Sequence, residues 1–114
     1  MSLILHTRTT GSIEILTLAG RLVLGNATAG LREKLRAAAI RPSSVLVDLS
    51  GVTYIDSAGL GELVSGFNAI TATGRFMKLL RPAQRVDSML HMTKLYSTFE
   101  IFEEETSALG SYLR

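Results

Sequence analysis

The segment from Val45 to Thr73 reads V-L-V-D-L-S-G-V-T-Y-I-D-S-A-G-L-G-E-L-V-S-G-F-N-A-I-T-A-T and contains two different patterns of apolar residues. Its first part, Val45 to Leu49, is short and nearly continuously apolar, which is typical of a strand covered on both faces. Its second part has the i, i+3, i+4, i+7 spacing of an amphipathic helix. The apolar positions of that helix are Leu60, Leu63, Val64, Phe67 and Ile70. The segment therefore predicts a buried strand followed by a helix over residues 57–73, with Glu62 and Ser65 facing outward.

Four residues, Asp56, Ser57, Ala58 and Gly59, connect the two patterns. Either Asp56 or Ser57 can be the N-cap, because each has an oxygen that accepts from the free N–H groups of the first helical turn. The sequence thus predicts a hydroxyl beside a carboxylate at the start of a helix. Open α/β sheets commonly carry functional groups at this position, directly after a buried strand. The small residues that follow leave the hydroxyl uncovered.

The rest of the chain supplies strands and helices in alternation. Residues 3–9 and 13–19 predict a β-hairpin, and Gly20 is expected to end its second strand. Further elements are expected as follows: a helix capped by Asn26 or Thr28 and ending near Ala39, a strand over residues 76–80, a helix after Pro82, a strand over residues 98–102 and a terminal helix. The order β-β-α-β-α-β-α-β-α predicts an α/β fold, with a mixed sheet, an N-terminal hairpin and about four helices. Residues 1–114 are expected to form a single domain.

The composition argues against several classes of protein. The 114 residues include no cysteine, so neither disulfides nor thiolate chemistry are expected. Two isolated histidines, His6 and His91, lack metal-ligand spacing, and no metal or cofactor is expected. The net charge is +2 and the basic residues are scattered, which argues against a nucleic-acid surface. No apolar run reaches the ~18 residues of a membrane span and no signal peptide is present, so we expect a cytoplasmic protein.

The D-S-A-G-L-G run at residues 56–61 resembles the signature of the STAS family, the anti-sigma-factor antagonists of bacterial sporulation and stress control. The resemblance extends to Gly20-Arg21-Leu22 and to residues 81–95, and it implies a single STAS domain with a STAS-like fold. It also implies partner switching. Ser57 would be the phosphoacceptor of a partner that is both an ATP-binding serine kinase and an anti-sigma factor. The unphosphorylated form would bind that partner and free a sigma factor for transcription, and a phosphatase would reset the switch.

The resemblance also implies a set of partner-binding residues around the phosphoacceptor. They are Asp56, Ala58, Gly59, Leu60 and Gly61, together with Val23 and Leu24. The last two depart from the family pattern, because well-known antagonists carry an aspartate where this chain has Val23. The apolar pair is either an exposed contact patch or packed under the first helix. This departure leaves the identity of the partner open.

Other interpretations of Ser57 compete with the switch. Asp56 and Ser57 can simply cap the helix. A hydrolase nucleophile would need G-x-S-x-G and a base, but Ile55 replaces the first glycine and neither histidine is predicted near Ser57. The chain also lacks a phosphate-binding glycine loop ending in lysine, so we expect no enzyme. Within the resemblance, the alternative is a STAS module of a lipid-transport complex or a stress-signalling scaffold without sigma-factor control.

Overall fold

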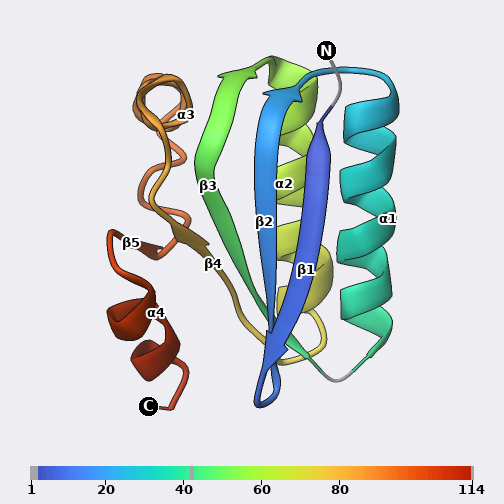
Figure 1. Ribbon diagram of the computed structural model, residues 1–114, viewed down its shortest axis with the longest axis vertical. Helices are drawn as coiled ribbons and strands as arrows, with labels where there is room; N and C mark the ends of the chain where they lie inside the picture. Colours follow the sequence, from blue (N-terminus) through green and yellow to red (C-terminus); the bar gives the residue numbers. More distant parts are fainter. Residues whose placement is uncertain (1–2, 42, 114) are drawn as a thin grey trace.

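The computed structural model describes residues 3–41 and 43–113 and shows a mixed five-stranded sheet with helices on both sides (Figure 1). The strands are β1 (Ile4–Thr10), β2 (Ile13–Leu22), β3 (Ser44–Ile55), β4 (Met77–Leu80) and β5 (Ile101–Phe102), and they lie side by side in chain order. The helices are α1 (Asn26–Ile40), α2 (Ser57–Thr71), α3 (Gln84–Met92) and α4 (Glu105–Ser111). β1 pairs antiparallel with β2 and the other pairs are parallel. The predicted α/β order and hairpin are confirmed.

The sheet separates two apolar clusters because side chains alternate between its faces. On one face Leu16, Leu18 and Val47 pack with residues of α1, α2 and α3. On the other face Ile15 and Leu46 pack under α4. Figure 1 shows α2 behind the strands, α1 to the right of them and α4 next to β5. Within the described residues, no helix is long and apolar enough to cross a membrane.

Helix α2 has the predicted apolar face with one error. Leu60, Leu63 and Ile70 are buried, whereas Val64 and Phe67 are half-buried against the same cluster. The error concerns Glu62, which we expected to face outward. Its side chain is only 14% exposed, because its Oε2 accepts from the Arg32 Nε of α1 at 3.0 Å. The two helices are therefore joined by an ion pair as well as by apolar contacts.

Both strands that lead to the site are longer than predicted. Gly20 does not end β2, which continues to Leu22, and the pairing with β3 shifts register on either side of Ala19 and Gly20. Gly20 has φ 112°, a conformation that favours glycine. The predicted strand at residues 45–49 continues to Ile55 through Gly51. A Cβ at Gly51 would lie 2.9 Å from the Leu18 carbonyl oxygen, so a glycine is needed where the two strands approach.

The first helix is capped differently from the prediction. Its N-cap is Gly25, with φ 128°, rather than Asn26 or Thr28. The Thr28 hydroxyl contributes from inside the helix, because it accepts from the Gly25 N–H at 3.0 Å and is also within 3.0 Å of the Gly25 carbonyl oxygen. The later strands β4 and β5 are shorter than the predicted ranges 76–80 and 98–102.

Candidate partner-binding site

Three segments meet at the edge of the sheet where the parallel strands end. The loop Val23–Gly25 follows β2, helix α2 follows β3, and α3 begins a few residues after β4. Because these strands are parallel, their carboxyl ends lie at the same edge. This edge brings together the Asp56-Ser57 pair and the Val23-Leu24 pair, which are more than thirty residues apart in sequence.

Asp56 holds this edge together. It is the N-cap of α2, and its Oδ1 accepts from the Gly59 N–H at 2.8 Å. Its Oδ2 accepts from the Leu24 N–H at 3.0 Å. These backbone hydrogen bonds, from Leu24 and then from Gly59, hold the pKa of the Asp56 carboxyl below its usual value. The carboxylate is therefore charged at neutral pH and is bonded to two segments.

Ser57 is the first residue of α2 and is exposed. Within the described part of the chain, its hydroxyl makes no hydrogen bond, so of the two possible caps only Asp56 has that role. Ala58 is half-buried and Gly61 is exposed. A Cβ at Gly61 would meet no atom within 4 Å. The hydroxyl is thus open to an approaching molecule, and the exposed Gly61 nearby in α2 carries no side chain.

Gly59 and Leu60, two of the predicted partner-binding residues, are buried, and Leu60 is only 5% exposed. A Cβ at Gly59 would lie 2.3 Å from the Leu22 carbonyl oxygen, so Gly59 allows α2 to approach the end of β2. Their side-chain positions therefore face the interior, and partner binding by these two residues stays a prediction.

The two residues of the Val23-Leu24 pair differ in exposure. Val23 is half-buried, whereas Leu24 is 75% exposed. Leu24 cannot turn under α1 easily, because its backbone N–H is held by Asp56. An apolar side chain therefore stands in solvent at the same edge as Ser57.

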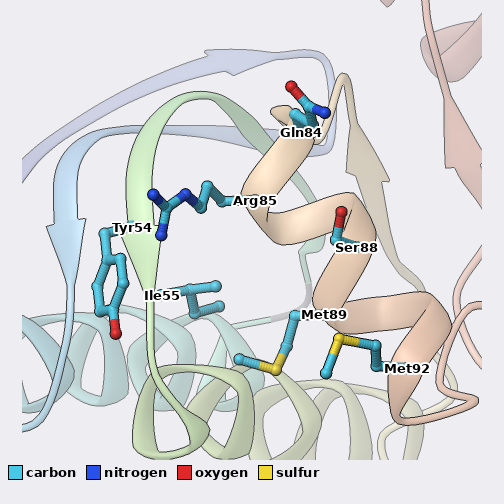
Figure 2. A pocket seen from close by; sticks show the side chains of 7 residues that line it. All are labelled: Tyr54, Ile55, Gln84, Arg85, Ser88, Met89 and Met92. Carbon is cyan, nitrogen blue, oxygen red and sulfur yellow. The ribbon is translucent and has the colours of Figure 1, made fainter.

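Sequence analysis missed a cationic group beside this edge. The guanidinium carbon of Arg21 lies 4.7 Å from the centre of the Tyr54 ring, and that of Arg85 lies 5.4 Å from the same centre. Next to them is an open cavity of about 460 Å³, lined also by Ile55 and Met89 (Figure 2). Arg21 did fall within the G-R-L segment of the resemblance, but its convergence with Arg85 depends on tertiary structure.

The two histidines lie on β1 and α3, so neither shares an element with Ser57. His6 is exposed on β1. His91 is exposed on α3, where its ring stacks on Tyr96 and its Nε2 is 3.6 Å from the Asp87 carboxylate. Among the described residues, no three His, Cys, Asp or Glu side chains are grouped so as to hold a metal ion.

Known proteins match both the sequence and the fold. The family model described as STAS domain matches residues 5–108. A candidate anti-sigma factor antagonist of Thermotoga neapolitana is 33% identical over 67 residues, which are 59% of this chain and 59% of that protein. The aligned part is thus less than two thirds of that relative.

Solved structures agree at lower identity. The crystal structure of a candidate anti-sigma factor antagonist of Thermotoga maritima has a TM-score of 0.88 at 22% identity, over 96% of this chain and 95% of that one. The phosphorylated form of the Bacillus cell fate determinant SpoIIAA has a TM-score of 0.77 at 18% identity, over 97% of this chain and 100% of that one. At such identities the likeness shows a common fold. Because the family model covers most of the sequence, the chain belongs to the STAS domain family.

Proposed function

We propose that this chain is an anti-sigma-factor antagonist that acts as a phosphorylatable partner switch, with Ser57 as the phosphoacceptor. One observation carries the proposal: an exposed serine hydroxyl, which makes no hydrogen bond within residues 3–41 and 43–113, begins α2 between a bonded carboxylate and two small residues. The similar Bacillus protein SpoIIAA has been solved in a phosphorylated form, which supports the same chemistry here. The proposed partners are an anti-sigma factor with ATP-dependent serine kinase activity and a phosphatase. We place all of them in the cytoplasm and treat the chain as a single STAS module.

The site can accept a phosphate without loss of the fold. A phosphoserine carries about −1.5 to −2 charges, and the free N–H groups and dipole of a helix N-terminus favour such an anion. The Asp56 carboxylate next to it opposes the added charge. At ~5 Å and an effective dielectric of ~20, each unit of like charge costs about 3 kcal/mol before solvent screening. An acidic or apolar partner surface would meet a similar penalty, so phosphorylation would prevent docking while the domain stays folded.

Catalysis by this chain is not part of the proposal. Ser57 has no base among its hydrogen-bond partners in the described residues, and both histidines lie on other elements. We expect esterase, phosphatase and ATPase turnover at background level. Turnover that disappears in Ser57→Ala would contradict this expectation.

The test uses the anti-sigma kinase of the same organism. Incubation with ATP, followed by mass spectrometry, should place one phosphate on Ser57. Ser57→Ala should resist phosphorylation, and Ser65→Ala, with an exposed serine two turns further along α2, should behave like the unchanged protein.

Calorimetric titration then measures the switch. Unmodified protein and Ser57→Ala should bind the kinase, and phosphorylated protein should bind more weakly. Ser57→Asp should fall between them, because it adds one charge without phosphate geometry. Equal affinity of all these forms for the kinase would show that Ser57 does not control binding and has only a structural position at the start of α2. If no anti-sigma factor binds but a membrane-transport or scaffold subunit does, the chain serves one of those assemblies instead.

A further inference from the structure

A pair of arginines shares one aromatic ring at the candidate site. Arg21 and Tyr54 are register partners of β2 and β3, so their side chains are neighbours on the sheet. Arg85 reaches the same ring from α3, as Figure 2 shows. Both guanidinium groups lie within the range of a cation–π contact, 4.7 and 5.4 Å from the ring centre. Both arginines are exposed, and Tyr54 is half-buried.

Among the arginines that the structure describes, these two differ from four that form ion pairs with carboxylates. The four pairs are Arg8 with Glu105, Arg32 with Glu62, Arg41 with Glu14 and Arg81 with Asp48. Within residues 3–41 and 43–113, neither Arg21 nor Arg85 forms an ion pair. The acidic groups of the adjoining segments are already engaged. Asp56 accepts from Leu24 and Gly59, and Asp87 lies beside His91.

The cavity next to Arg85 is lined by apolar side chains as well as by the polar residues Gln84 and Ser88. Met89 and Met92 project from α3 beside Ile55, and Met92 is 79% exposed (Figure 2). Methionine side chains are flexible and polarizable, so they adapt to an apolar group that enters between them. Leu24, at the same edge of the sheet, adds a second exposed apolar side chain. The surface therefore combines uncompensated positive charge with apolar anchor points.

We propose that the Arg21–Tyr54–Arg85 cluster and its cavity are the docking site for an acidic, apolar segment of the anti-sigma factor. An aspartate or glutamate of that segment would meet the two guanidinium groups, and a neighbouring apolar side chain would enter between Met89 and Met92. Complementary charge across an interface favours such a partner and excludes a basic one. This inference rests on the proposed function and adds the surface and the chemistry of the partner.

The same arrangement gives the switch a physical cause. Ser57 follows Tyr54 by three residues, so a phosphate on Ser57 would bring a dianion to the edge where the acidic segment docks. The phosphate would repel that segment and would compete with it for the arginines. Affinity would then fall without any change in the backbone of the antagonist.

Charge reversal tests the docking site. The anti-sigma factor of the same organism is titrated calorimetrically with the unchanged protein, Arg21→Glu, Arg85→Glu and Arg75→Glu. Arg75 is an exposed arginine before β4, at the opposite end of the sheet, and serves as the matched control. The first two variants should each bind about tenfold or more weakly, and the control should stay within about twofold. Added salt should weaken the unchanged protein more than either variant. Thermal melts establish that each variant is folded.

A second measurement identifies the occupant. A benzoylphenylalanine photo-crosslinker in place of Met92 should link to a peptide of the anti-sigma factor that carries aspartate or glutamate close to the linked residue. A basic linked peptide would overturn the inference. Unchanged affinity of Arg21→Glu and Arg85→Glu for the anti-sigma factor would also overturn the inference. If phosphorylation of Ser57 still weakened binding in that case, the proposed function would stand without this docking site.

Two further outcomes would each overturn the docking inference. If ATP or inorganic phosphate binds the isolated protein with a Kd below about 1 mM, and Arg85→Glu abolishes that binding, the cluster is a small-anion site and the docking inference is wrong. If the unchanged protein neither binds an anti-sigma factor nor becomes phosphorylated on Ser57, both the inference and the proposed function fail.

Discussion

Two glycines of α2, two residues apart, should respond in opposite directions to the same substitution. At Gly59 a Cβ would lie 2.3 Å from the Leu22 carbonyl oxygen, 2.9 Å from Leu22 Cγ and 3.0 Å from Ile55 Cγ1. The closest of these atoms belongs to the backbone, and that oxygen also accepts from the Asp56 N–H at 3.3 Å. At Gly61 a Cβ would meet nothing within 4 Å. The first alanine must displace the end of β2, whereas the second enters open space.

The magnitudes follow from these distances. Overpacking of this kind costs about 1–3 kcal/mol of unfolding free energy, and at Gly59 the backbone contact places the cost in the upper half of that range. Gly61→Ala removes a helix-interior glycine and should stabilise by about 0.5–1 kcal/mol. For a domain of this size, 1 kcal/mol corresponds to roughly 3–6 °C in Tm. The two variants should therefore melt about 8–24 °C apart, on either side of the unchanged protein.

Thermal melts by circular dichroism, with urea unfolding as a second method, measure the difference. Equal m-values are needed, because a changed slope would report a changed denatured state. If Gly59→Ala were as stable as Gly61→Ala, the end of β2 would have to move freely. Close packing of α2 against the end of β2 would then be refuted as the reason for a glycine at position 59.

Three more variants test other parts of the fold. Leu63→Ala, in the core face of α2, should destabilise by about 2–5 kcal/mol in urea unfolding, and a cost below 1 kcal/mol would show that the cavity collapses. Tyr112→Phe removes the 2.6 Å hydrogen bond to the Val45 carbonyl and should cost about 0.5–1.5 kcal/mol, with hydrogen exchange faster in α4 than elsewhere. The folded pKa of Asp56 lies below its unfolded value of about 4, so its contribution is complete above pH 4 and lost as pH falls through the folded pKa. Asp56→Asn should accordingly lose less stability between pH 4 and pH 2 than the unchanged protein, and parallel acid limbs would contradict that.

Apolar spacing was sufficient to predict the element order, and local backbone chemistry explains the errors. The strand-to-helix change around residue 56 was visible because the hydrophobic period changes there. The sequence predicts that Gly20 ends its strand and that the next strand covers only residues 45–49. Gly20 instead lies within β2, where the register shifts, and β3 continues through Gly51, where the two strands approach closely. Neither a register shift nor a close approach leaves a periodic signal in the sequence.

The candidate site was predicted only in its local part. Asp56 and Ser57 are adjacent, so a cap and a free hydroxyl could be expected from the sequence. The burial of Gly59 could not, because it depends on where the end of β2 lies. The same holds for Arg21 and Arg85, which come from separate elements and meet only across the ring of Tyr54. Contacts of this kind are set by tertiary packing.

The double hydrogen bond of Asp56 has a consequence for the speed of signalling. One carboxylate ties the Leu24 amide and the Gly59 amide together, so the loop after β2 and the start of α2 form one rigid unit. A rigid surface loses little conformational entropy when a partner binds and needs no refolding before the partner leaves. Exchange of partners would then be limited by dissociation alone.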